Sequence, residues 1–303
     1  EIINTINIKE KSIILHDVRF KYKVSKKKLV KFKKIPSNIF SRFLAEYWIF
    51  KNVHKDDVVL YFGNLPPLFR LKGKVFVFIQ NRFLLDKKYS YKQLSFFAKT
   101  RINYERFILN LFKNNVNKYI VQTESMLKLL KEIVDIEVYK LPFVPQTELK
   151  IKKNFSQNKR KIYDFIYVAS GEGHKNHRKV LKAFLLLAKE NIYPSILFTL
   201  KSKKYNKLIE EINHLNQFKK LRVFNVDWSN NNDFYNLYLE SSALLFPSTC
   251  ESYGLPLMEA KFLKMPILAP ELDYVRDIVD PDQVFDPSSA ISISRAIKRF
   301  LKL

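Results

Sequence analysis

The stretch Phe246-Pro-Ser-Thr-Cys-Glu-Ser-Tyr-Gly-Leu-Pro-Leu-Met-Glu-Ala260 is the most informative part of the sequence. The apolar run 243–246 that leads into it predicts a short buried strand. Gly254-Leu255-Pro256 then opens an amphipathic helix, because the first N–H groups of a helix have no helical partner and proline is well placed there. Those free N–H groups and the helix dipole form a natural anion site. Two carboxylates, Glu251 and Glu259, flank this helix start with seven residues between them.

Short apolar runs alternate with amphipathic stretches on both sides of this motif. Beyond residue 161, strands are expected near residues 162–169, 194–200, 221–226, 243–247, 266–269 and 283–285, and helices near 176–190, 203–214, 231–241, 255–264, 271–278 and 288–302. In the first half, strands are expected near 12–20, 57–62, 75–79, 118–122 and 136–139, and helices after Ser37 and near 91–112 and 123–133. This alternation predicts an α/β protein with a parallel, doubly wound sheet in each half.

The segment between Pro142 and Lys161 separates the two halves. It contains Pro142, Pro145 and the charged run 150–161, and the alternation of strands and helices restarts after it. We therefore expect a first domain over residues 1–145, a linker over 146–161 and a second domain over 162–303. A chain of 303 residues that is 47% hydrophobic is long enough for two cores of ordinary size.

Polar residues follow three expected strands of the second half. They are Ser170-Gly-Glu-Gly-His-Lys-Asn176, the turn that contains Glu251, and Pro270-Glu271. Ligands of open parallel sheets bind beyond the carboxyl ends of the strands, so these segments are expected to share one pocket. Gly171 allows close approach of the backbone to a ligand, and Lys175 offers a mobile charge suited to a phosphate.

The string from Glu251 to Glu259, with Gly254-Leu255-Pro256 and Met258-Glu259-Ala260 inside it, resembles the signature of family 4 retaining glycosyltransferases of the GT-B fold. The resemblance covers roughly residues 160–290 in good order and residues 12–145 more loosely. It implies two Rossmann-like domains that face each other across a cleft, with the nucleotide sugar bound by the second domain. The family normally begins with a strand and a Gly-rich loop and ends with a helix that crosses back, so this chain is expected to be trimmed at both ends.

The resemblance implies a retaining hexosyltransferase that uses a nucleotide diphosphate sugar as donor and needs no further cofactor. Glu251, which would hold hydroxyls of the donor sugar, and Lys175, which would contact the diphosphate, are the expected catalytic residues. Glu259 would bind the ribose hydroxyls, and the N–H groups at Gly254 and Leu255 would cradle the diphosphate. The expected donor-binding residues are Gly171, Lys175, Glu251, Tyr253, Gly254, Leu255 and Glu259.

One position departs from the pattern of the family. An Arg usually stands five residues before the Lys, and here that place holds Ser170. One expected cation is therefore missing. This keeps open the alternative that the chain is a catalytically inactive GT-B scaffold or partner subunit.

The first half is expected to supply the acceptor side of the cleft, for a glycan or a lipid-linked acceptor. Asn64, Asn81 and Arg82 follow the expected strand ends and are the candidates. The family often carries a His after a strand in this half, and the nearest position here is Asn81. An ordinary turn role for Asn81 is the alternative.

No metal site is expected, because Lys175 and helix N–H groups would neutralise the leaving diphosphate. Asp280-Pro-Asp282 matches the Asp-x-Asp string of metal-dependent glycosyltransferases, but its place in a proline turn favours turn chemistry. The single cysteine, Cys250, excludes an internal disulfide and fits a reducing compartment. It is interpreted as a buried bystander, because no partner His is placed by motif.

The net charge of +25 suggests an anionic partner: a membrane surface, nucleic acid or a phosphorylated substrate. Compositional bias is the alternative. The lysine-rich segment 21–34 and the aromatic stretch 40–50 suit a peripheral membrane surface, or else a solvated loop followed by a core helix. Binding to nucleic acid is not expected, since many aromatic residues occupy apolar positions of predicted helices and should lie in the core.

The sequence contains no signal peptide and no apolar run near the ~20 residues that span a bilayer. A cytoplasmic location is expected, with peripheral attachment to the inner face of the membrane left open. Many members of the family assemble surface polysaccharide or lipopolysaccharide there, and the resemblance implies a similar role in a bacterium.

Overall fold

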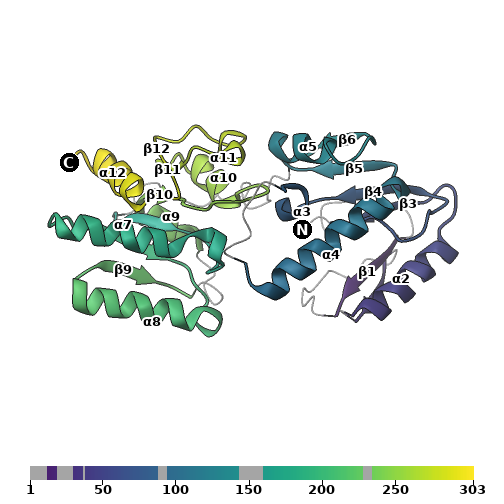
Figure 1. Cartoon of the computed structure of the whole chain (residues 1–303), viewed down its shortest axis with the longest axis horizontal. Helices are drawn as coiled ribbons and strands as arrows, with labels where there is room; N and C mark the ends of the chain where they lie inside the picture. The colour runs from purple at the N-terminus through teal and green to yellow at the C-terminus, as the bar shows by residue number, and fades with distance from the viewer. Residues whose placement is uncertain (1–11, 19–29, 37, 88–93, 143–159, 228–233) are drawn as a thin grey trace.

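The computed structural model describes residues 12–18, 30–36, 38–87, 94–142, 160–227 and 234–303. All of the strands that it describes pair in parallel, and they form three sheets of two, four and six strands. In Figure 1 the four-stranded and the six-stranded sheet lie in different halves of an elongated molecule. The α/β class and the parallel pairing that the sequence predicts are confirmed.

The second half contains the six-stranded sheet, with helices along it. Its strands are β7 (Tyr163–Tyr167), β8 (Ser195–Phe198), β9 (Arg222–Asn225), β10 (Ser241–Leu245), β11 (Ile267–Pro270) and β12 (Gln283–Phe285). Its helices are η3 (Gly173–Lys175), α7 (His177–Lys189), α8 (Ser202–Lys219), α9 (Phe234–Leu239), α10 (Leu255–Phe262), α11 (Asp273–Arg276) and α12 (Ala290–Leu301). Each expected strand and helix of this half is present, with ends shifted by a few residues.

The strand order of this sheet is β12-β11-β10-β7-β8-β9. The chain therefore starts at the centre with β7, moves outward through β8 and β9, and returns to the other side of β7 with β10. This is the doubly wound Rossmann order, and its direction reverses between β7 and β10. The loops that leave the carboxyl ends of these two strands flank the crevice where such sheets bind ligands.

The first half contains the other two sheets. Its strands are β1 (Ser12–Asp17), β2 (Val30–Ile35), β3 (Val58–Tyr61), β4 (Lys74–Phe78), β5 (Lys118–Val121) and β6 (Val138–Lys140). Its helices are α2 (Ile39–Asn52), α3 (Arg82–Leu85), α4 (Phe96–Phe112), η2 (Lys113–Asn115) and α5 (Glu124–Lys131). The larger sheet runs in chain order, β3-β4-β5-β6, and β1 pairs only with β2. Among the strands that the structure describes, the strand order therefore reverses direction in the six-stranded sheet and not in the four-stranded sheet.

Two expectations for the first half are wrong. The end of the lysine-rich segment forms a strand, β2, in which Lys31, Lys33 and Lys34 are exposed. The aromatic residues of α2 and α4 are also not uniformly core residues, because Phe40 and Phe97 are among the large hydrophobic side chains that remain exposed. The rest of the lysine-rich segment, 21–29, and residues 146–159 of the expected linker lie outside the described residues.

The buried apolar side chains form one cluster in each half. The cluster of the second half is centred on β7, β8 and β10, whose side chains are almost all buried. The cluster of the first half joins β4 and β5 to α3, α4 and α5. Among the helices of the described residues, none is long and apolar enough to cross a membrane.

Candidate active site

The turn after β10 leads into α10, and Gly254 shapes the junction. Gly254 has φ 72° and ψ 56°, the left-handed conformation that glycine adopts at little cost. Pro256 occupies the first turn of α10, as predicted, and no side chain caps this helix start. Pro256 has no N–H, and the N–H of Leu257 donates to the carbonyl of Gly254 over 2.9 Å. This leaves the N–H groups of Gly254 and Leu255 as the donors that an anion could use at this helix start. Tyr253 is buried in this junction, and Leu255 is exposed.

Lys175 and Glu251 form an ion pair at the crevice. Lys175 ends η3 after β7, Glu251 lies in the turn after β10, and Nζ is 2.5 Å from Oε1. The two side chains are 17% and 13% exposed, so both are largely shielded from solvent. The distance satisfies the sequence prediction that Lys175 and the Glu251 turn lie close together.

Hydrogen bonds to backbone carbonyls hold η3 against this turn and against β7. Thr249 donates from its backbone N–H to the carbonyl of His174 over 2.9 Å, and its hydroxyl donates to the same oxygen over 3.0 Å. The hydroxyl of Tyr167, on β7, donates to the carbonyl of Lys175 over 2.7 Å. Asn176 takes the left-handed conformation and donates from Nδ2 to the carbonyl of Pro247. The position of Lys175 is thus fixed from three sides.

Glu259 lies one turn inside α10 and accepts a hydrogen bond from a buried tyrosine. The hydroxyl of Tyr238, on α9, is 2.5 Å from Oε2 of Glu259. Burial raises the pKa of the Glu259 carboxyl, and the hydrogen bond from Tyr238 opposes this rise. Glu259 is therefore not the solvent-facing glutamate of an ordinary helix surface. The sequence offers no spacing rule that pairs Tyr238 with it.

Gly171 has a packing role in addition to its place beside the crevice. A Cβ on Gly171 would lie 2.6 Å from Cδ1 of Tyr205. Tyr205 and Lys204 both bond the carboxylate of Glu172. Burial would raise the pKa of Glu172, but hydrogen bonds from Ser170, Tyr205 and Lys204 lower it to about 2. The glycine therefore lets α8 approach the loop after β7.

The three acceptor-side candidates of the first half all have partners within the protein. Asn64 accepts hydrogen bonds at Oδ1 from the N–H groups of Gln80 and Asn81, over 2.6 and 3.0 Å. Asn81 caps α3 by accepting from the N–H of Phe83. Asn64 and Asn81 thus join the loop after β3 to the loop after β4.

Arg82 joins the two halves. Its Nη1 and Nη2 donate to Oδ1 and Oδ2 of Asp273, on α11, over 2.8 and 2.7 Å. Its Nε and Nη2 also donate to Asp86. This fork is the geometry in which Arg binds a carboxylate most firmly. Arg82 is buried and directed at the second half, and sequence reasoning did not identify its partners.

Other contacts bring the first half next to the Lys175–Glu251 pair. The hydroxyl of Thr123, which caps α5 as predicted, donates to the carbonyl of Ser252 over 3.1 Å. The ring of Phe83 lies edge-on to that of His174, with 5.3 Å between centroids. The first half therefore touches the neighbour of Glu251 and the neighbour of Lys175.

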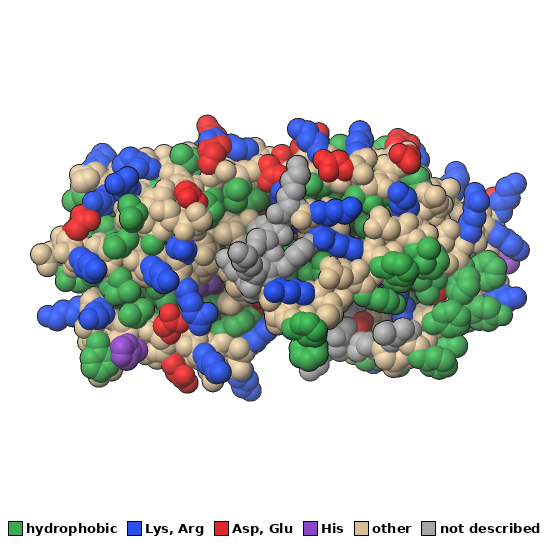
Figure 2. All heavy atoms as spheres, in the orientation of Figure 1, with side chains coloured by type: hydrophobic (Ala, Val, Ile, Leu, Met, Phe, Trp, Pro, Cys, Tyr) green, Lys and Arg blue, Asp and Glu red, His purple; other side chains and the backbone are tan. Residues whose placement is uncertain are grey.

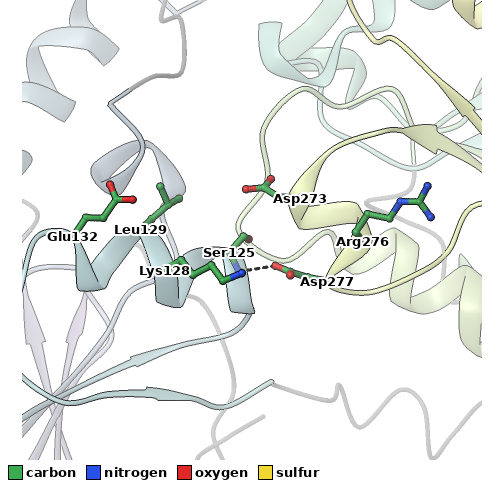
Figure 3. A pocket seen from close by; sticks show the side chains of 7 residues that line it. All are labelled: Ser125, Lys128, Leu129, Glu132, Asp273, Arg276 and Asp277. Carbon is green, nitrogen blue, oxygen red and sulfur yellow. Dashed lines mark hydrogen bonds between the residues drawn. The ribbon is translucent and has the colours of Figure 1, made fainter.

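A hollow of about 310 Å³ lies at another part of the boundary between the halves. Figure 3 shows it between α5 and α11, next to the 2.8 Å hydrogen bond from the N–H of Ser125 to Oδ2 of Asp277. It is lined by Ser125, Lys128, Leu129, Glu132, Asp273, Arg276 and Asp277. None of the predicted donor-binding residues lines it, so this hollow is distinct from the predicted donor site.

The structure also places the residues considered for other chemistry. Within the described ranges, no three His, Cys, Asp or Glu side chains are grouped so that they could hold a metal. Asp280 pairs with Arg276, and Asp282 accepts from the N–H of Ile267 over 2.8 Å. Cys250 is buried, and burial raises the pKa of its thiol to about 12, so it is a thiol and not a thiolate at neutral pH.

Solved structures that are similar to this chain cover both of its halves. The chain is similar to WaaG, a glycosyltransferase involved in lipopolysaccharide biosynthesis, with a TM-score of 0.59 and 15% identity over 93% of this chain and 80% of that one. It is also similar to HepE of Anabaena, determined in complex with UDP and glucose, with a TM-score of 0.58 and 11% identity over 90% and 77% of the two chains. At these identities the likeness is one of fold, and the fold is GT-B.

Comparison of sequences gives a relative and a family. The chain is 29% identical over 141 residues to the serotype-specific mannosyltransferase WbdA of Escherichia coli. This match covers 46% of the chain and 17% of WbdA, so the chain spans a small part of the length of this relative. The profile of glycosyl transferases group 1 matches residues 146–303, which is more than half of the chain. This match takes in the whole six-stranded sheet with Lys175, Glu251 and Glu259, and the chain belongs to the family of glycosyl transferases group 1.

Proposed function

We propose that this protein transfers a sugar from a nucleotide diphosphate sugar to a glycan or lipid-linked acceptor, with retention of anomeric configuration, in the assembly of a bacterial surface polysaccharide or lipopolysaccharide. The observation that carries the proposal is the ion pair between Lys175 and Glu251, which lies beside the uncapped start of α10 at the reversal of strand order. Supporting it are the UDP and glucose bound by HepE and the involvement of WaaG in lipopolysaccharide biosynthesis.

The leaving group is the part of the reaction that most needs charge stabilisation. Cleavage of the bond between sugar and phosphate leaves a diphosphate anion and a sugar with oxocarbenium character. Lys175 and the free N–H groups at Gly254 and Leu255 are placed to stabilise the anion, and donors fixed in advance in a shielded site are effective at this task. Under this proposal no divalent metal is required.

The two glutamates have separate tasks. Glu259, held by Tyr238, offers one carboxylate oxygen to the protein and leaves the other for the ribose hydroxyls of the nucleotide. Glu251 lies nearer the first half and holds hydroxyls of the donor sugar at the reacting carbon. Tyr253 and Gly171 shape the walls beside these groups.

The acceptor enters from the side of the first half. Thr123 and Phe83 touch the segments that carry Glu251 and Lys175, so the first half borders the reacting centre. Asn64 and Asn81 sit at the strand ends that face the same boundary, although both already support the local backbone. Arg82 pairs with Asp273 and so holds the two halves together. Its effect on the acceptor is therefore indirect.

The proposal is tested by screening the purified chain against a panel of nucleotide sugars for a thermal shift. The best donor is then incubated with candidate acceptors, and the anomeric configuration of the product is determined by proton NMR. Binding followed by a product of retained configuration supports the proposal. An inverted product would contradict retention. Tight binding with neither transfer nor hydrolysis would favour the inactive scaffold, in which Ser170 replaces a needed cation.

A further inference from the structure

Helix α4 carries a row of large apolar side chains on its exposed face. Phe97 is 82% exposed, Phe96 is 74% exposed and Phe107 is 61% exposed, and Tyr104 and Leu111 are also exposed. Phe97, Tyr104 and Leu111 follow one another at intervals of seven residues, so they lie along one side of the helix. Ile102 and Leu109, which lie away from this row, are buried in the core, and so is Ile108 beside it. The helix is therefore apolar on two sides, and only one of them is covered.

Helix α2 repeats this arrangement. Phe40 is 70% exposed, and Phe43, Leu44 and Tyr47 follow it at helical spacing as exposed side chains. A lysine stands beside this row: Nζ of Lys51 lies 5.6 Å from the ring centre of Tyr47. We call the exposed apolar residues of the two helices the aromatic face: Phe40, Phe43, Leu44, Tyr47, Phe96, Phe97, Tyr104, Phe107 and Leu111.

The half of the chain that carries the aromatic face is basic. Figure 2 shows hydrophobic side chains gathered in patches, with Lys and Arg around them, on the part of the surface where Figure 1 draws α2 and α4. Residues 1–142 contain 29 Lys and Arg against 12 Asp and Glu. Exposed apolar patches mark sites of interaction, and a positive field selects an anionic partner.

We infer that the aromatic face docks the first half onto the surface of an anionic lipid bilayer. Aromatic rings fit the headgroup region, aliphatic side chains reach the acyl boundary, and lysines meet the charged headgroups. A second copy of the chain fits the face less well, because two equally basic surfaces would repel each other. This inference concerns the first half and does not depend on the identity of the donor.

Nucleic acid is the other anionic partner that exposed aromatic rings could accept. Single strands bind where rings stack on bases along a basic groove. Leu44 and Leu111 belong to the aromatic face, and aliphatic side chains offer no flat surface for a base. The mixture of rings and aliphatic side chains favours lipid.

The test is co-sedimentation of the 303-residue chain with vesicles of phosphatidylcholine, with and without phosphatidylglycerol. The variants are Phe96→Ser with Phe97→Ser on α4, and Phe40→Ser with Leu44→Ser on α2. The matched control is Phe218→Ser, because Phe218 is a 61% exposed ring on α8 of the second half. All of these side chains are exposed, so thermal unfolding should show each variant to be folded like the wild type.

The wild type and the Phe218→Ser protein should bind the anionic vesicles equally, and binding should weaken in high salt. Each pair of substitutions on the aromatic face should weaken it by about tenfold or more, because insertion of a ring is lost. Equal binding by all variants would overturn the inference, as would equal binding to neutral and anionic vesicles. Displacement of the vesicles by single-stranded RNA, lost in the Phe96→Ser, Phe97→Ser protein, would assign the face to nucleic acid instead.

Discussion

Lys175 and Glu251 are 76 residues apart in the chain, yet Nζ of the first lies 2.5 Å from Oε1 of the second. Each side chain supplies the charge that the other needs in a largely shielded place. A diphosphate that binds at the start of α10 therefore competes with Glu251 for the ammonium group of Lys175. Substitutions of the two residues should therefore change the affinity for the nucleotide and the rate of transfer in different ways.

Glu251→Gln should leave the affinity for a nucleotide diphosphate unchanged or slightly higher, because Lys175 is released to the diphosphate. Transfer should fall by roughly 100-fold or more, since the sugar loses a charged partner at the reacting carbon. Isothermal titration calorimetry and initial rates measure the two effects. Glu271→Gln is the control, because Glu271 follows β11 at the same edge of the sheet but pairs with Arg276. A loss of affinity as large as the loss of rate would refute the separate roles.

Lys175→Ala should weaken binding of the nucleotide diphosphate and also reduce transfer. The diphosphate that Lys175 would contact is part of the bound donor and is also the leaving group. Binding by the wild type should be equal with and without a chelator, since no divalent ion is proposed in the donor site. Both effects are read by calorimetry. Lys182→Ala, which removes an exposed lysine of α7, should bind as the wild type does. Abolition of binding by the chelator would show that the site has been assigned wrongly.

Tyr238→Phe should make nucleotide binding more sensitive to acid. Burial raises the pKa of Glu259, and the hydroxyl of Tyr238 counteracts this by bonding the carboxylate. Without the hydroxyl the pKa rises further, so the charged form that would bind the ribose is lost at a higher pH as the solution is acidified. Affinity measured while the pH is lowered towards the usual Glu pKa of about 4.3 should fall at a higher pH in the variant than in the wild type.

The control for this prediction is a change in the ligand. A nucleotide diphosphate that lacks the ribose hydroxyls should bind the wild type and Tyr238→Phe equally at every pH, because it makes no bond to Glu259. If the variant binds this analogue more weakly as well, Tyr238 supports the fold of α9 and α10 and does not position Glu259.

The Arg82–Asp273 pair should couple the two halves energetically. Arg82→Ala and Asp273→Ala should each destabilise the protein, and the double variant should lose less than the sum of the two. A coupling of about 1 kcal/mol is expected for a forked pair with one partly exposed member. Chemical unfolding of the four proteins gives this value. Strict additivity would mean that the pair contributes nothing to the joining of the halves.

The second half could be predicted from the sequence in detail. Strands such as β8 and β10 are buried on both faces, so they are continuous apolar runs that stand out between polar loops. The loops that follow β7 and β10 carry glycine and charged residues, and strand order brings their ends together. Knowledge of the fold class was therefore sufficient to predict that Lys175 lies close to Glu251.

The first half could be predicted less well, for physical reasons. In β2 the lysines are exposed, and such a strand forms by pairing with β1, which local sequence does not reveal. In α2 and α4 the apolar residues occupy two sides of the helix, and spacing alone cannot say which side is covered. Partners such as Tyr238 for Glu259 and Asp273 for Arg82 depend on contacts between distant elements.

The strand order of the second half also sets constraints on how this protein is synthesised. β7 pairs with β8 on one side and with β10 on the other, and β10 begins only at Ser241. A ribosome that has released β7, β8 and β9 exposes a growing sheet whose central strand, with Phe165, Ile166 and Tyr167, still has an open edge. Such an edge can pair with another chain. Fast release of residues 226–245, or a chaperone that shields β7 until they emerge, should therefore determine how much folded protein a cell obtains.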